Sequence, residues 1–127
     1  MRTIEITRAE WPAFFDSFSR QHEGWLADLE IIDPELGAQL EAEQLPLEGV
    51  TAELKDEGTD EIVIILGRKA QDHVTHTVAR PTRVMLEQND EGADEALQIE
   101  SSETAKVLLR FRSPMLAEAV DGVVSET

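Results

Sequence analysis

The amino-acid sequence predicts a single α+β domain, in which one N-terminal amphipathic helix packs on a curved, mostly antiparallel sheet or partial barrel of about eight short strands. The chain has 127 residues, the length of one domain, so we treat residues 1–127 as one unit with an ordered part of about residues 2–123. An apolar stripe with helical spacing occurs near the N-terminus, and alternation with a period of two follows it along most of the chain.

The helix is predicted from about residue 8 to about residue 23. Thr7 and Glu10 precede it at the spacing of a capping box, and Gly24 can end it in a left-handed conformation. Apolar aromatic residues recur along it at spacings of three and four, which indicates a face buried against a sheet. We assign this stripe, with the Trp25 that follows, to the structural core: Trp11, Phe14, Phe15, Phe18 and Trp25.

Short alternating segments bounded by turn residues predict the strands. They lie at residues 3–6, 25–31, 38–42, 50–54, 62–66, 74–78, 84–88, 97–99 and 107–111. Residues 45–49 interrupt the alternation, which separates the third segment from the fourth. Residues 62–66 are apolar at every position and predict a central strand covered on both faces. Ser113 and Pro114 favour the start of a short C-terminal helix that runs to about Val120.

The charge of the chain excludes several classes of partner. Asp and Glu number 27 against 11 Lys and Arg, so the formal net charge is −16, which would repel nucleic acid and anionic membranes. No apolar run approaches the ~20 residues of a membrane span, and from the pattern of the first residues we expect no signal peptide. The absence of cysteine removes disulfides, thiolate nucleophiles and sulfur ligands. We therefore expect a cytoplasmic protein whose partner, if it has one, offers a basic protein surface.

The candidate residues for chemistry are few, and none supports a catalytic, cofactor or metal site. His73 and His76 lie three apart in a predicted strand, where they would point to opposite faces and could not share one ion. The acidic loop at residues 90–95 lacks the spacing of a calcium loop, so we interpret it as a solvated hairpin loop. His22 is interpreted as a partly buried histidine at the end of the helix. The glycines are scattered and form no phosphate-binding loop.

Arg80 and Arg83 form the one candidate binding pair. They flank a predicted turn in a chain with few basic residues, and together they could hold a carboxylate or phosphate of a ligand or partner. The alternative is a salt bridge from each arginine to the acidic surface of the same molecule.

Several stretches resemble one family of short bacterial proteins. They are EWP at 10–12, QHEGW at 21–25, GAQLEA at 37–42, RPTRV at 80–84, DEGADEAL at 90–97 and LRFRS at 109–113. The family is domain of unknown function number five-three-three-five, and the resemblance covers roughly residues 4–123. The resemblance implies a complete bacterial domain and brings no catalytic residue with it.

Two functional hypotheses follow from these observations. The first is a small, acidic, non-catalytic binding or interaction module. The alternative is a small-ligand pocket, with an enzymatic role left open, between the aromatic face of the helix and the curved sheet. The core separates them, because aromatic side chains that fill the concavity of the sheet leave no room for a ligand. The sequence indicates no oligomeric state.

Overall fold

The computed structural model describes residues 2–55, 59–67, 72–102 and 106–112. These residues form one helix, one 3₁₀ turn and eight strands, which confirms the predicted fold class. In chain order the elements are β1 (Arg2–Ile6), η1 (Arg8–Glu10), α1 (Trp11–His22), β2 (Leu26–Asp33), β3 (Gly37–Glu53), β4 (Glu61–Leu66), β5 (Val74–Ala79), β6 (Pro81–Gln88), β7 (Asp94–Ser101) and β8 (Lys106–Phe111). The predicted C-terminal helix that starts at Ser113 lies outside the described residues.

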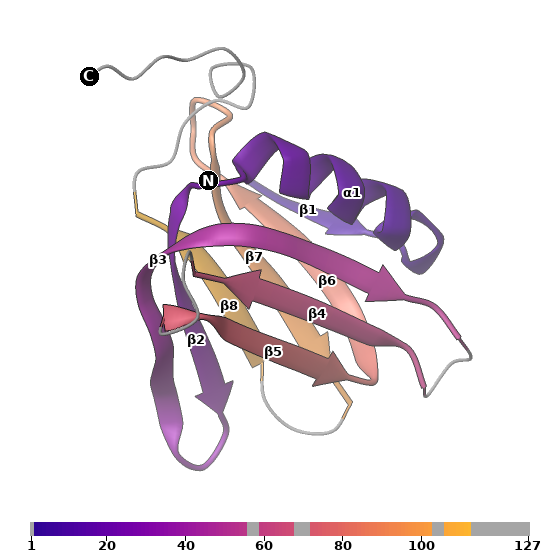
Figure 1. Ribbon diagram of the computed structural model, residues 1–127. Coiled ribbons are helices and arrows are strands. Elements are labelled where there is room, and N and C mark those ends of the chain that lie inside the picture. Colours follow the sequence, from indigo (N-terminus) through magenta and orange to yellow (C-terminus); the bar gives the residue numbers. More distant parts are fainter. Residues whose placement is uncertain (1, 56–58, 68–71, 103–105, 113–127) are drawn as a thin grey trace.

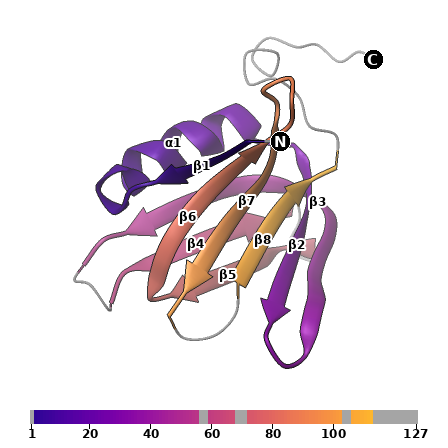
Figure 2. The same cartoon turned by 180° about the vertical axis from the view of Figure 1, so that it is seen from behind.

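The strands make one sheet with the order β1-β6-β7-β8-β2-β3-β4-β5, and every neighbouring pair is antiparallel. The sheet is open, since β1 and β5 are its two edges. It bends sharply along β3, so that β3, β4 and β5 lie in front of β6, β7 and β8 (Figure 1). The view from behind shows the second group facing the viewer (Figure 2).

β3 is the element that joins the two parts of the sheet. It is one strand of 17 residues, where we had predicted two strands separated at residues 45–49. Its first half pairs with β2 and its second half with β4. The strand turns without losing its pairing because Gln44 adopts a left-handed φ of 54°, and the register shifts between Leu47 and Gly49. The N–H of Gln44 is satisfied by the Asp28 carboxylate at 2.8 Å.

The helix starts differently from the prediction. The first turn, η1, is a 3₁₀ turn in which the N–H of Glu10 donates to the carbonyl of Thr7 at 2.9 Å. In a capping box the N–H of Glu10 would donate to the side-chain oxygen of Thr7. Here that N–H is bonded to the Thr7 carbonyl, and the Thr7 hydroxyl donates to the Glu10 carboxylate at 3.0 Å. At the other end Gly24 has a φ of 87°, the left-handed conformation that was predicted.

The helix lies along the open side of the sheet, beside β1 and β3 (Figure 1). The Ser19 hydroxyl fixes it to β3, since it accepts the N–H of Val50 at 2.8 Å and donates to the carbonyl of the same residue at 3.0 Å. The Ser19 hydroxyl thereby satisfies the backbone N–H and carbonyl of Val50, which point to the side of β3 where no strand pairs with this residue. The helix thus takes the place of a strand along the second half of β3.

The core lies between the two parts of the sheet and the buried face of α1. It is formed by side chains from the helix and from seven of the strands: Trp11, Phe15, Phe18, Ala27, Leu29, Ala42, Leu47, Val50, Ile62, Ile64, Leu66, Val78, Val84, Leu86, Leu97, Ile99, Val107, Leu109 and Phe111. The prediction that residues 62–66 are covered on both faces is wrong. Ile62, Ile64 and Leu66 are buried, but Val63 and Ile65 are only half-buried, because α1 sits at the side of the sheet and does not cover the outer face of β4.

Candidate functional site

The aromatic stripe of the helix occupies the space where a ligand pocket was considered. Trp11, Phe15 and Phe18 are buried in the core, and Phe14 and Trp25 pack partly buried against it. The indole N–H of Trp11 donates to the carbonyl of Ile6 at 2.9 Å, so even its polar edge is satisfied inside the protein. These side chains fill the concavity between the aromatic face of α1 and the described strands.

A buried polar network lies at the C-terminal end of the helix. His22 has no exposed surface, so it is more buried than predicted, and its ring stacks on Phe111 with centroids 5.0 Å apart and lies 4.4 Å from Trp25. Its Nε2 lies 2.9 Å from Asp94 of the acidic loop, which is also buried. The second oxygen of Asp94 accepts the Gln88 amide at 2.8 Å. No local pattern indicates this pairing, because the two residues are 72 positions apart.

Both ring nitrogens of His22 are bonded inside the protein. The Nδ1 of His22 is 2.7 Å from the carbonyl oxygen of Phe18, which can only accept, so Nδ1 carries a proton. Nε2 of His22 lies 2.9 Å from the Asp94 carboxylate, so both ring nitrogens have a partner inside the protein. Because the ring lies within aromatic side chains and inside the core, we interpret the pair as a structural element.

The remaining histidines do not form a metal site with other described residues. His73 comes just before β5 and faces Glu48 at 3.4 Å, whereas His76 lies within β5. Across the described part of the chain, no group of three or more His, Cys, Asp or Glu side chains could hold a metal ion.

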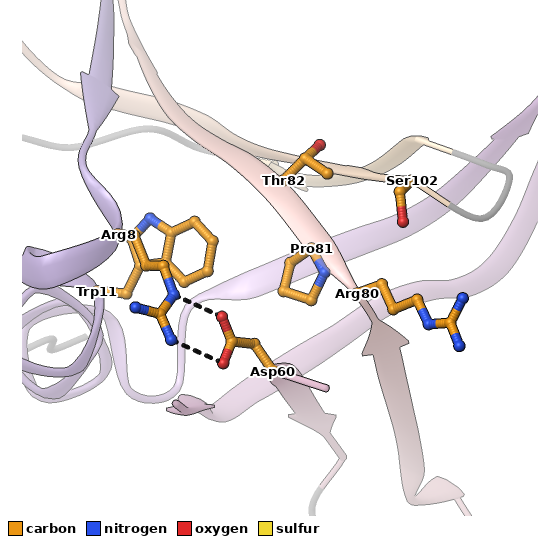
Figure 3. Close-up of a pocket in the computed structure, with 7 residues that line it drawn as sticks. All are labelled: Arg8, Trp11, Asp60, Arg80, Pro81, Thr82 and Ser102. Carbon is orange, nitrogen blue, oxygen red and sulfur yellow. Dashed lines mark hydrogen bonds and ion pairs between the residues drawn. The ribbon is translucent and has the colours of Figure 1, made fainter. Parts of the chain in front are cut away.

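A surface cavity of about 280 Å³ lies at the corner where β5 passes into β6. Its lining residues are Arg8, Trp11, Asp60, Arg80, Pro81, Thr82 and Ser102 (Figure 3). Arg80 makes the corner, with a left-handed φ of 54°, an N–H that donates to Asp60 O at 3.1 Å and a carbonyl that accepts the N–H of Ser102 at 3.0 Å. Its guanidinium points away from the Arg8–Asp60 pair (Figure 3).

Arg8 and Asp60, which both line this cavity, form an ion pair with each other. Arg8 donates to both oxygens of Asp60, from Nε at 2.6 Å and from Nη2 at 3.0 Å. The N–H of Lys55 adds a third bond to that carboxylate, at 2.8 Å. Arg8 first, and then the Lys55 N–H, lower the pKa of Asp60, against the opposing effect of its burial at 3% exposure. Asp60 is therefore ionised at neutral pH and fixes the N-terminal end of the helix to β4.

The structure does not bring Arg80 and Arg83 together in this cavity. Arg83 lies on the outer face of β6, where it donates to Glu5 of β1 at 3.2 Å and lies 3.8 Å from Glu100 of β7. The hydrogen bond and charge of Glu5, with the charge of Glu100, raise the pKa of Arg83. The alternative of an intramolecular salt bridge therefore describes Arg83, while Arg80 as a contact for an anion or partner stays a prediction.

Among the described residues, the most exposed large apolar side chains lie on the hairpin of β2 and β3. We call residues 30–41 the hairpin arm, and Figure 1 shows it projecting past the ends of the other strands. Leu36 in its turn is 71% exposed and Leu40 on β3 is 51% exposed. Ala38 is exposed between them, and Ile32, its partner on β2, is half-buried. The outer side of the arm thus carries a small apolar surface.

A one-residue shift in pairing puts Leu40 on this outer side. Ala42 pairs with Leu29 and faces the core, but Leu40 pairs with Glu30, so Glu41 is an extra residue in β3. Because neighbouring residues of a strand face opposite sides, the extra residue reverses the orientation of everything beyond it. The alternation of Ala38, Leu40 and Ala42 had suggested that all three face one side.

Carboxylates surround the apolar surface of the arm. Residues 21–54 contain nine Asp and Glu and neither Lys nor Arg. Asp33 accepts the N–H groups of Leu36 and Glu35 at 3.0 and 2.7 Å, which lower its pKa and fix the turn that carries Leu36. Glu30 lies 3.8 Å from Arg110, whereas no ion pair between described residues holds Glu35 or Glu41.

Comparison with known proteins places the chain in a family without giving it an activity. The family described as "Family of unknown function (DUF5335)" matches residues 2–120. An "Uncharacterized protein" of Aquifex aeolicus (strain VF5) is 28% identical over 112 residues, which cover 88% of this chain and 94% of that protein. No solved structure matches the chain. None of the described helices is long and apolar enough to cross a membrane.

Proposed function

Because the chain belongs to the family of unknown function DUF5335, whose description assigns no activity, we propose from its geometry that it is a non-catalytic interaction module of the cytoplasm. The hairpin arm is the contact surface, and the partner is a protein that offers apolar side chains flanked by Lys and Arg. The observation that carries this proposal is the exposure of Leu36 and Leu40 on a projecting hairpin.

The position of these leucines supports a docking role. Isolated exposed apolar residues are common on protein surfaces, but apolar residues gathered on one side of a projecting hairpin indicate a contact with something outside the molecule. The hydrogen bonds from Leu36 and Glu35 to Asp33 hold the turn in one conformation, so little ordering is needed when a partner binds.

The charge around the leucines selects the partner. Glu35 and Glu41 lie on the arm without an ion pair to described residues, so cations on a partner would meet carboxylates that are not already neutralised in this way. Opposite charges of this kind speed association and exclude acidic partners, and salt screens them. The complex should therefore weaken as salt is added, while the contacts of the leucines remain.

Photo-crosslinking in native cells tests this proposal directly. A photoreactive phenylalanine derivative is placed at Leu36, at Leu40 or, as a control, at Ser17, which is exposed on α1. We expect the two arm positions to give an adduct with the same basic protein, and the Ser17 position to give none. The adduct yield should fall between about 0.05 and 0.5 M NaCl in lysate. The absence of adducts from both arm positions, or equal adducts from Ser17, would contradict the proposal.

A further inference from the structure

The two edges of the sheet differ in how they are protected. Edge β1 carries Arg2 and Glu5, Glu5 is bridged to Arg83, and the carbonyl of Ile6 accepts the Trp11 indole. Edge β5 has the sequence VTHTVA, which contains no Lys, Arg, Asp, Glu or Pro. Charged residues and proline are the usual means by which an edge strand avoids pairing with another chain. β5 lacks all of them.

The hydrogen bonds at the corner show which backbone groups of β5 point away from the sheet. The N–H of Arg80 donates to the carbonyl of Asp60, next to the pair formed by Ala79 and Glu61. Because bonding direction alternates along an antiparallel strand, even-numbered residues of β5 bond to β4 and odd-numbered residues point outward. The Ser101 hydroxyl agrees with this assignment, as it donates to the outward carbonyl of Ala79 at 2.7 Å.

Among the described residues, the other outward groups of β5 belong to Thr75 and Thr77. The side chains of both residues are exposed on the outer face of the sheet. The Ser101 hydroxyl at the end of β7 occupies the outward carbonyl of Ala79. Thr75 and Thr77 therefore each present a backbone N–H and a carbonyl at the spacing that a further strand of the sheet would require.

The charge distribution indicates what can pair there. With a net charge of −16, two copies of the chain repel each other over most of their surfaces. Residues 73–86 contain no Asp or Glu, so β5 itself adds no negative charge to a contact between two copies. The exposed threonines are short, β-branched and uncharged, which favours cross-strand packing between identical strands.

We propose that the open edge of β5 pairs with the β5 of a second copy of this chain. The strands run antiparallel, with Thr75 of each copy opposite Thr77 of the other, and each such pair exchanges both of its N–H···O bonds. This arrangement has two-fold symmetry and joins two sheets into one. The pairing is short, because Ser101 closes the edge at Ala79, so the dimer is weak, reversible and favoured by salt. It leaves the hairpin arm uninvolved and does not depend on the function proposed for it.

Charge-reversal variants test the pairing. Sedimentation of the full chain is measured from about 10 μM to about 1 mM, where mass action favours a weak dimer, in about 0.5 M NaCl. The wild type should shift toward a dimer with concentration. Thr75→Lys/Thr77→Lys and Thr75→Glu/Thr77→Glu should each stay monomeric, because like charges oppose each other across the pair. An equal mixture of the two variants should form a dimer again.

The restored dimer separates pairing at β5 from any loss of folding, and circular dichroism of each variant adds a second control. Thr77→Ser, which keeps the N–H and adds no charge, should associate like the wild type. A wild type that stays monomeric at the highest concentration would overturn the proposal, and so would a dimer that both charged variants retain. Adducts from the arm in the crosslinking experiment are independent of either result.

Discussion

Two regions of this molecule reverse the usual distribution of polar and apolar side chains. His22 and Asp94 form a polar pair inside the core, between Phe18, Phe111 and Trp25. Leu36 and Leu40 lie outside on the hairpin arm, among carboxylates. The buried pair is satisfied by bonds within the protein, to the Phe18 carbonyl and to Gln88, whereas the leucines are mostly open to solvent.

The two regions therefore have different roles, since the buried pair stabilises the fold and the exposed leucines are available for binding. Buried polar groups cost free energy unless each is bonded, so a fully bonded pair is maintained by the fold and in turn restrains it. The leucines contribute little to the folded state, since Leu36 and Leu40 remain 71% and 51% exposed. We therefore expect substitutions in the first region to unfold the protein, and substitutions in the second to leave it folded but unable to bind its partner.

The largest effect is expected when the buried pair loses one member. His22→Leu leaves the Asp94 carboxylate buried with only Gln88 as a partner, and should lower the free energy of unfolding by about 3–5 kcal/mol in urea titrations. The double variant His22→Leu/Asp94→Leu removes both polar groups and should recover most of that loss. A loss below about 1 kcal/mol in the single variant would mean that the pair is not a structural element.

Phe15→Ala provides the reference for an ordinary core residue. Phe15 is fully buried, and its truncation should cost about 3–5 kcal/mol through lost burial and the cavity that remains. Phe14→Ala, at the half-buried position next to it, should cost distinctly less. Equal losses measured by thermal unfolding at the two positions would contradict the assignment of the helix faces.

A smaller effect, with a defined pH dependence, is expected at Asp60. Arg8 lowers the pKa of Asp60 in the folded state, so the folded protein binds that proton less readily than the unfolded chain does. The stabilisation is therefore present above the unfolded pKa of about 3.9 and is lost as the pH falls through the lower, folded value. Urea midpoints measured at pH 5 and pH 3 should fall more for the wild type than for Asp60→Asn. Equal falls would show that the Arg8–Asp60 pair adds no stability that depends on pH.

The sequence was sufficient for the elements that local pattern determines. The stripe from Trp11 to Phe18 located the helix, Gly24 located its end, and alternation located most strands. It failed where the outcome depends on long-range packing. The position of α1 at the side of the sheet cannot be predicted from the apolar run at residues 62–66. The bend of β3 without a break in pairing cannot be predicted from the residues at 45–49.

The candidate site was harder to predict than the fold. Leu40 and Ala42 have the same spacing as two core residues, and only the extra residue at Glu41 places them on opposite faces. A bulge of one residue leaves no reliable mark in a sequence, because many residue types can occupy it. Likewise, nothing local distinguishes Asp94, which binds His22, from the solvated carboxylates beside it in the same loop.

The smallest change in stability is expected at the arm, and its measurement tests the central claim most directly. The double variant Leu36→Ser/Leu40→Ser should unfold in urea within about 0.5 kcal/mol of the wild type, as substitutions of exposed residues usually do. At the same time it should lose the basic partner that the wild type captures. A loss of more than about 2 kcal/mol would show that the leucines stabilise the fold, and the arm would then not be a surface kept for a partner.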